Sequence, residues 1–274
     1  MFAITLLTSL TLIPFVNAQA TSLGVEAIEA HFSQSAIVPD LLASFNPSAL
    51  LTLNFPVVGD VQPGQSLTQA QVAQTPTVTI TPANSSTSLN STYTLVMVDA
   101  DIVGSKLPQG QTRHWLENSV VINGSVVSNA SATVITRYAG PAPAAGSGPH
   151  RYVVLLYAQP STFKAPPAYS QSNIGVSTFD FNAYVQESGL GALIAGNYFT
   201  VEVETATVSI SATSPVVSST LPVLSTSPSS SSSSSSSSTP SKTSGASDLV
   251  VQSSFLAVSL ILAKVLLQAV CFGC

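Results

Sequence analysis

Length, composition and charge already exclude some classes of protein. The chain has 274 residues, of which 45% are hydrophobic and only 7% are charged, whereas an average soluble domain carries about 25% charged residues. Nucleic-acid binding requires a clustered basic surface. The 7 Lys and Arg residues against 12 Asp and Glu, a net charge of −5, do not supply one. The length accommodates one domain of about 150–200 residues with additional terminal segments.

The first 18 residues have the features of a secretory signal peptide. A long apolar stretch ends in Val16-Asn17-Ala18, with small residues at the two positions that determine cleavage. The basic residues that usually begin such a signal are missing, and a buried N-terminal core segment is the alternative. We expect a secreted chain that begins at Gln19.

Residues 247–274 have the pattern of a signal for a glycosylphosphatidylinositol (GPI) anchor. The small residues Ser244-Gly245-Ala246 are followed by a short spacer and an apolar tail. A retained transmembrane helix is the alternative, but a central Lys such as Lys264 costs a membrane span about 2.5–3.5 kcal/mol. We expect attachment at Ser244 or Gly245 and removal of the tail.

A Ser/Thr-rich tract, residues 205–246, precedes the anchor signal. It contains the uninterrupted serine run Ser229–Ser238 and too little apolar surface to offset the entropy of ordering. Interspersed prolines are typical of an O-glycosylated stalk, with a plain flexible linker as the alternative. We therefore predict a folded domain at 19–204. The only two cysteines, Cys271 and Cys274, lie in the removed tail, so the domain has no disulfide.

Four Asn-x-Ser/Thr sequons lie inside this domain and indicate a glycoprotein. Each must lie at the surface if it is glycosylated. They are Asn84, Asn90, Asn123 and Asn129.

Most of the domain has the residue pattern of β-strands. The β-branched and aromatic runs are Leu51–Phe55, Thr77–Ile80, Tyr93–Val98, Trp115–Ile122, Tyr152–Tyr157 and Tyr198–Val203. No long helices alternate with them, which favours a mainly antiparallel sheet or sandwich over a doubly wound α/β fold. We expect helices at Val25–Ser35 and at Phe179–Ser188, the second capped by Ser177 or Thr178 and ended by Gly189.

Polar side chains gather at the ends of two of these strands. Residues two apart in an extended chain share a face, so the carboxylates of Asp99 and Asp101 are expected to project into one place. A Gly/Pro-rich loop leads into the next segment, where His150 and Tyr152 share one face and Arg151 takes the other. Such polar patches beside loops often form the mouth of a pocket, although an Asp-x-Asp is also a common turn former.

The start of the Trp115–Ile122 run is also polar. By the same alternation Arg113, Trp115 and Glu117 are expected to share a face, while His114 points away.

The string GPAPAAGSGPHRYVVLLYAQ, from Gly140 to Gln159, resembles the second sequence signature of the phosphatidylethanolamine-binding protein (PEBP) family. The segment from Asp99 to Gly124 is similar to the first signature, and Phe179–Phe199 is similar to the family's C-terminal helix and strand. The resemblance covers residues 26–203. It implies a mainly β fold, with a large central antiparallel sheet, a smaller sheet and a few peripheral helices.

The resemblance also implies a small anion-accepting pocket for phosphate-type head groups, with no cofactor. Its residues would be Asp99, Asp101, Trp115, His150 and Tyr152, with Pro141 in the rim. Members of the family are mostly non-catalytic. They bind lipids and nucleotides, inhibit serine proteases or carboxypeptidases, or scaffold signalling partners.

Three positions depart from the family pattern. Ala100 and Val103 replace two prolines of its first signature, and Glu117 replaces a second pocket histidine, for which His114 cannot substitute on the expected alternation. We expect Glu117 in the pocket beside His150. Three carboxylates repel phosphate unless one keeps its proton. Otherwise they favour a cationic, zwitterionic or metal ligand.

Three functions follow as hypotheses. The first is a non-catalytic module at the cell surface that binds a phosphate-bearing or zwitterionic head group. The second is a secreted inhibitor of a serine protease or carboxypeptidase. The third is a metal-dependent hydrolase that uses Asp99, Asp101, Glu117 and His150, because carboxylates and imidazole suit hard or borderline ions. A Ser-His-Asp hydrolase is disfavoured because the chain lacks a G-x-S-x-G motif.

Overall fold

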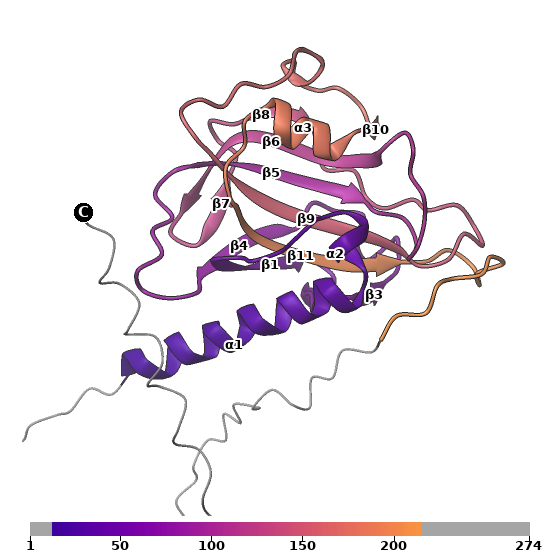
Figure 1. The fold of residues 1–274 in the computed structure, drawn as a ribbon, viewed down its shortest axis with the longest axis horizontal. Helices are drawn as coiled ribbons and strands as arrows, with labels where there is room; N and C mark the ends of the chain where they lie inside the picture. Colours follow the sequence, from indigo (N-terminus) through magenta and orange to yellow (C-terminus); the bar gives the residue numbers. More distant parts are fainter. Residues whose placement is uncertain (1–12, 215–274) are drawn as a thin grey trace, which may run out of the picture. The chain divides into compact units, whose positions relative to one another are not determined.

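One curled sheet of eleven strands dominates the part of the chain that the computed structural model describes, residues 13–214 (Figure 1). The elements in chain order are α1 (Ile13–Gln34), α2 (Ile37–Asp40), β1 (Ala49–Phe55), β2 (Gly59–Asp60), β3 (Gln65–Leu67), β4 (Thr77–Pro82), β5 (Thr92–Asp99), β6 (Gln111–Asn123), β7 (Val126–Ser128), β8 (Thr133–Thr136), β9 (His150–Gln159), the 3-10 turn η1 (Pro167–Tyr169), β10 (Ser177–Phe179), α3 (Phe181–Glu187) and β11 (Leu193–Val201).

The strand order is β2-β1-β4-β7-β6-β5-β9-β11-β3, with β8 and β10 added to β6. Among these strands only β3 and β11 pair in parallel, so the mainly antiparallel prediction is confirmed. The smaller sheet that the family resemblance implies is part of the same sheet, since its strands share hydrogen bonds with the large one. The curl brings β1 against β11, where Asn197 Nδ2 donates to Leu51 O at 2.9 Å.

Each face of the sheet carries its own apolar core. The inner core combines alternate residues of β1, β4, β5, β6, β9 and β11, including Leu53, Met97 and Val154, all fully buried. The outer core combines the opposite faces of β5, β6 and β9 with the helices. Strand β9 is buried on both faces, which accounts for its unbroken apolar sequence VVLLY.

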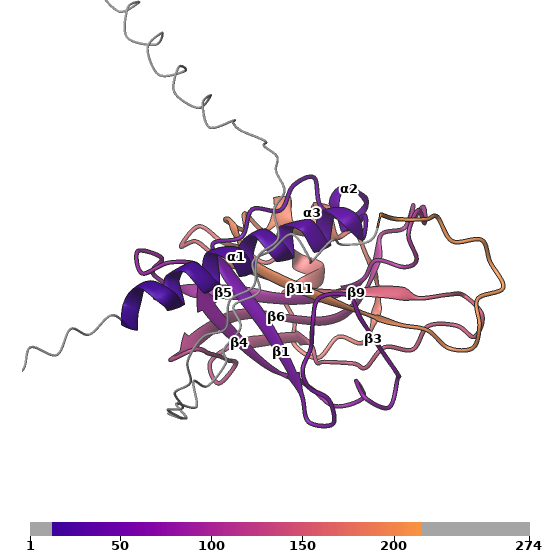
Figure 2. The same ribbon diagram turned by 90° about the horizontal axis from the view of Figure 1, so that it is seen from below.

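Helix α1 lies along the outer face of the sheet (Figure 2) and is anchored there by one ring. Phe32 is fully buried, stacks on Phe45 with ring centroids 3.9 Å apart and meets Tyr198 edge to face at 5.7 Å. Gly196 in β11 makes this approach possible, because a Cβ there would lie 3.0 Å from Phe32 and 3.2 Å from Phe45.

The structure changes the boundaries of both predicted helices. Helix α1 begins at Ile13 rather than Val25 and includes residues 13–18 of the predicted signal peptide. Helix α3 is capped by Asp180, whose carboxylate accepts from Ala183 N at 2.9 Å. Ser177 and Thr178 cannot cap it because they pair with β6 as part of β10.

Several predicted segments fall outside the described residues. These are residues 1–12 of the signal peptide, the stalk from 215 onward and the whole anchor signal, including Cys271 and Cys274. All four sequon asparagines are exposed, as glycosylation requires. Domain contacts continue past the predicted boundary at 204, because Thr207 N donates to Gly146 O at 2.9 Å. Within residues 13–214 no helix combines the length and apolarity of a membrane span.

The anchoring of α1 is testable by truncating its buried ring. Phe32→Ala is expected to lower the free energy of unfolding by about 3–5 kcal/mol, because it leaves a cavity between Phe45 and Tyr198. Val57→Ala is the control, since Val57 is 68% exposed and surface changes cost within about 0.5 kcal/mol. Urea unfolding can be followed by the fluorescence of Trp115, the only tryptophan. Equal effects of the two changes would contradict this packing of α1.

Candidate functional site

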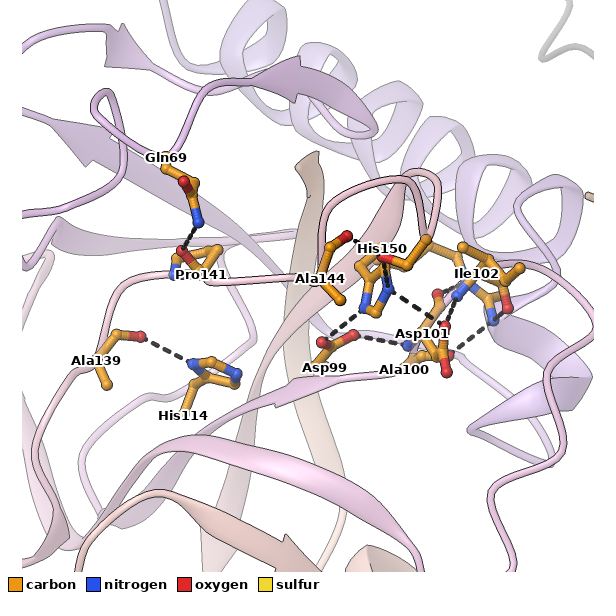
Figure 3. Close-up of polar contacts among 12 residues, drawn as sticks. Gln69, Asp99, Ala100, Asp101, Ile102, His114, Ala139, Pro141, Ala144 and His150 are labelled. Atoms are coloured by element: carbon orange, nitrogen blue, oxygen red, sulfur yellow. Dashed lines mark hydrogen bonds and ion pairs between the residues drawn. The ribbon is translucent and has the colours of Figure 1, made fainter. Parts of the chain in front are cut away.

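Charged side chains meet where β5 ends and β9 begins (Figure 3). Antiparallel pairing of these strands sets Asp99 opposite Tyr152. His150 Nδ1 lies 2.9 Å from Asp99 Oδ2, and His150 Nε2 lies 3.5 Å from Asp101 Oδ1. The two carboxylates therefore do project into one place, as expected from their spacing. We call Asp99, Asp101 and His150 the Asp–His cluster.

A tight turn after β5 sets the position of the second carboxylate. Asp101 has a φ of 59°, a left-handed conformation that Asp adopts more readily than most residues. Its N–H donates to Asp99 Oδ1 at 2.7 Å, and its own carboxylate accepts from Ile102 N at 2.6 Å. Short side chains that accept from the following backbone stabilise such turns, so the turn-forming interpretation of Asp-x-Asp is confirmed, and the site interpretation stays a prediction.

Arg151 supports this turn from the opposite face of β9. Its side chain is 2% exposed, and it donates at 3.0 Å to the carbonyls of Ala100, Asp101 and Ile102. It also pairs with Asp40 at 3.1 Å. The sequence analysis placed Arg151 on this face without giving it a role. An arginine inside an otherwise apolar strand was the signal, because buried charges need paired partners.

The expected alternation along β6 is wrong for Arg113 and His114, because the strand contains a bulge there, whereas Trp115 and Glu117 do share a face. Met97 pairs with Trp115 and Val98 with Arg113, which leaves His114 as the extra residue. His114 therefore faces the inner core, with its ring 5.3 Å from the Tyr152 ring.

Arg113 faces the other way. Its guanidinium lies 5.2 Å from the ring centroids of Tyr169 and Phe179 in the outer core, and its Nε donates to Thr136 at 2.6 Å. Arg113 and Trp115 thus do not share a face, and Arg113 takes no part in the Asp–His cluster.

Glu117 also lies apart from the cluster. It pairs with Leu95, four residues along β5 from Asp99 and so about 13 Å away. Together with Trp115 it lines a cavity of about 220 Å³, which we call the Glu117 cavity. The structure therefore corrects the expectation that Glu117 stands beside His150. The four-residue metal set of the hydrolase hypothesis is not assembled, and within residues 13–214 no other His, Cys, Asp and Glu side chains form a metal-binding group.

The two histidines near the inner core have opposite pKa shifts. Burial lowers the pKa of His150, but the hydrogen bond and charge of Asp99, with the charge of Asp101, outweigh burial, and the net pKa is raised. Burial dominates at His114 and lowers its pKa. Because His114 Nδ1 lies 3.0 Å from the carbonyl of Ala139, that nitrogen carries the proton.

Tyr152 is fully buried between these groups. In the described part of the chain its hydroxyl has no hydrogen-bond partner of good geometry. Burial, followed by the negative charge of Asp99 and a contact with its carboxylate, raises the pKa of Tyr152, while the Ala142 backbone opposes the rise, so the hydroxyl remains protonated. Pro141 lies in the loop that passes this region (Figure 3), and its carbonyl accepts from Gln69 at 3.4 Å.

A chain of hydrogen bonds joins Ser147, His150 and Asp99, as in a catalytic triad. The protons along this chain are not placed as a triad requires. Ser147 Oγ lies 2.9 Å from His150 Nε2 and donates its own proton to the carbonyl of Ala144 at 2.6 Å. A general base must accept the serine proton. Here both ring nitrogens of His150 face acceptors, which matches a protonated imidazolium. The geometry therefore favours binding over nucleophilic catalysis.

A family model described as phosphatidylethanolamine-binding protein matches residues 58–207, more than half of the chain. The chain belongs to the PEBP family. The resemblance stated from the two signatures is thereby confirmed, and so is the PEBP-like fold. PEBP proteins form a ligand-binding family whose members are largely non-catalytic binders or inhibitors.

Curated relatives extend this comparison. A "26 kDa secreted antigen" of Toxocara canis is 35% identical over 174 residues, which are 61% of this chain and 62% of that protein. The chain thus matches less than two thirds of this relative. "CEN-like protein 1" of Nicotiana tabacum is 32% identical over 171 residues, 62% of this chain and 90% of that protein.

A solved structure shows the same fold. It is the carboxypeptidase Y inhibitor crystallised with its cognate proteinase, at a TM-score of 0.54 and 24% identity, covering 70% of this chain and 98% of that one.

The effect of Asp99 on the pKa of His150 is testable by titrating His150. Asp99→Asn is expected to lower the pKa of His150, because burial then acts with less opposition. Nuclear magnetic resonance can follow its ring signals, since the chain has only 3 histidines. A raised folded-state pKa stabilises the protein below about pH 6.5, and this contribution is lost as the pH rises through the folded value. Asp99→Asn should remove it.

Asp60→Asn is the control for this titration, because Asp60 is exposed and bonds only to Asn54. It should leave the pKa of His150 unchanged. An unchanged pKa in Asp99→Asn would show that Asp99 does not hold the imidazolium.

Proposed function

We propose that this PEBP protein is a non-catalytic binding module displayed at the cell surface, and that it binds a small phosphate-bearing, zwitterionic head group at the Asp–His cluster. The observation that carries the proposal is His150 held between two carboxylates at 2.9 and 3.5 Å, beside the buried hydroxyl of Tyr152, which has no hydrogen bond of good geometry within residues 13–214. Cation, carboxylate and neutral donor lie together on the inner face of the sheet.

The charge balance favours a zwitterion over a simple phosphate. Two carboxylates face one imidazolium, so a free phosphate dianion would be repelled. The ammonium end of a zwitterion can pair with Asp101, whose side chain is 31% exposed. The phosphate end can accept from the hydroxyl of Tyr152 and, at lower pH, from protonated His114. Pro141 remains a candidate for the rim of this site.

Surface display follows from the terminal segments. The predicted signal peptide, Ser/Thr-rich stalk and anchor signal at Ser244 or Gly245 together hold a domain off a membrane. The similarity to a secreted antigen supports export. The four exposed sequons are compatible with passage through a secretory pathway.

A second candidate is inhibition of a serine protease or carboxypeptidase. The solved carboxypeptidase Y inhibitor shares the fold over 98% of its length. Inhibition would use a surface segment of the domain rather than the Asp–His cluster, so loss of the cluster would leave it intact.

Head-group binding is testable with sn-glycero-3-phosphoethanolamine, whose single phosphodiester charge does not change between pH 5.5 and 7.5. The affinity of the full chain for this compound, measured by calorimetry, is expected to rise as the pH falls, because His150 and then His114 gain positive charge. His150 titrates above its ordinary pKa of about 6.5 and His114 below it. An affinity that is constant or falls would contradict a role for the histidines.

The hydroxyl of Tyr152 offers a sharper test of the same site. Tyr152→Phe removes only the donor, and a hydrogen bond to a charged group contributes about 1.5–3 kcal/mol, so affinity should fall at least tenfold. Tyr157→Phe is the control, because Tyr157 is buried in the outer core at the other end of β9. Equal affinities of the wild type and Tyr152→Phe would place the ligand elsewhere.

The anchor is testable on intact cells. Phosphatidylinositol-specific phospholipase C is expected to release the protein, because the GPI lipid would be its only attachment. A chain truncated before Ser244 should be secreted freely. Release by detergent alone, with an epitope after Phe255 still present, would contradict the anchor and support a retained membrane helix.

A further inference from the structure

The Glu117 cavity is distinct from the Asp–His cluster and combines three features of a ligand site. Residues of β4, β5, β6 and β7 line it, with a volume of about 220 Å³. Its apolar wall includes Val78, Leu95 and Val127. Its polar groups are the Glu117 carboxylate, the Trp115 indole, the Asn129 amide and the hydroxyls of Thr75 and Thr77.

The carboxylate is buried without a cation. Glu117 is 4% exposed, and its Oε1 accepts from Asn129 Nδ2 at 3.0 Å. In the described part of the chain no Lys, Arg or His pairs with it. A carboxylate removed from water is costly unless a positive charge or several hydrogen bonds compensate it. One amide donor leaves most of that requirement unmet.

The indole is the second polar group without a partner. Trp115 is 4% exposed, and its Nε1–H is fully buried with no acceptor among residues 13–214. Buried donors in native proteins almost always find an acceptor. Two residues that line the cavity thus have buried polar groups without a full set of partners within residues 13–214: Glu117 has no cation, and Trp115 Nε1–H has no acceptor.

We propose that the Glu117 cavity binds a small quaternary ammonium alcohol. The positive charge lies against Glu117 and the Trp115 ring, the pairing of carboxylate and aromatic face that recognises quaternary ammonium groups. The alcohol oxygen accepts from Trp115 Nε1–H. N-methyl groups suit the apolar wall of Val78, Leu95 and Val127 and the ring of Trp115.

Size and position make this site independent of the proposed head-group site. A volume of about 220 Å³ is below the roughly 300–1,000 Å³ of pockets for drug-sized ligands, so only a compact ion fits. Glu117 lies four residues along β5 from Asp99 in the sheet register, about 13 Å. A single phosphocholine or phosphoethanolamine group is too short to span both sites.

Choline and its uncharged isostere 3,3-dimethylbutan-1-ol test the proposal on the unmodified full chain. Trp115 is the only tryptophan and lines the cavity, so its fluorescence reports occupancy directly. Choline is expected to give a saturable change in emission. The isostere, which has the same shape and hydroxyl without the charge, should bind at least tenfold more weakly. Equal responses to the two compounds, or no saturable response to choline, would overturn the proposal.

Glu117→Gln isolates the charge, because glutamine keeps the size and can still accept from Asn129. It should weaken choline binding at least tenfold, whereas Glu187→Gln, an equal loss of charge on exposed α3, should not. Unchanged binding in Glu117→Gln would overturn the proposal. If that variant fails to fold by circular dichroism, the wild-type comparison of choline with its isostere still decides.

The head-group proposal and the choline proposal can be contradicted independently of each other. Binding of sn-glycero-3-phosphoethanolamine should persist in Glu117→Gln, and choline binding should persist in Tyr152→Phe. Loss of both ligands in either variant would show that the two sites are one, and would overturn the independence of the Glu117 cavity.

Discussion

The Asp–His cluster depends on the hydrogen bonds that the buried guanidinium of Arg151 makes. The guanidinium donates to three consecutive carbonyls after β5 and pairs with Asp40. Backbone bonds support the same turn, since Arg151 N donates to Asp101 O at 3.1 Å and Ser105 N donates to Ile102 O at 3.2 Å, but only the Arg151 side chain joins all three carbonyls. Two rigidifying prolines of the family's first signature are absent here, at Ala100 and Val103. Side-chain and guanidinium hydrogen bonds thus hold this turn without them.

Strand β9 carries both Arg151, which supports the turn, and His150, which belongs to the Asp–His cluster. Consecutive residues of β9 point to opposite faces, so His150 faces the carboxylates while Arg151 lies beneath the turn that presents Asp101. A charged residue therefore lies on each face of the strand, with Arg151 buried and His150 partly exposed. Strand β9 thus connects the outer core to the cluster on the inner face. In the outer core Arg151 contacts Asp40 and donates at 2.8 Å to the carbonyl of Ser35, directly after α1.

The bulge in β6 decides which side chains complete the inner face. It turns His114 toward Tyr152 and Arg113 toward the outer aromatic rings. His114 occupies space beside the cluster, while Glu117 stays in a separate cavity with Trp115. Glu117 therefore adds no negative charge beside His150, and the Asp–His cluster holds two carboxylates rather than the three expected in one pocket.

The sequence by itself determined the mainly β fold and the family, and the family resemblance predicted that Asp99, Asp101, His150 and Tyr152 lie together. Alternation along a regular strand is a local property, and the Gly140–Gln159 signature is contiguous. Only the tertiary structure decided the positions of His114, Arg113 and Glu117. A bulge adds one residue to one strand, and its location depends on how the partner strand pairs, which local periodicity does not encode. The sequence marks Arg151 as unusual, a charge inside an apolar strand, but it does not identify the acceptors of Arg151, which lie up to 116 residues away in the chain.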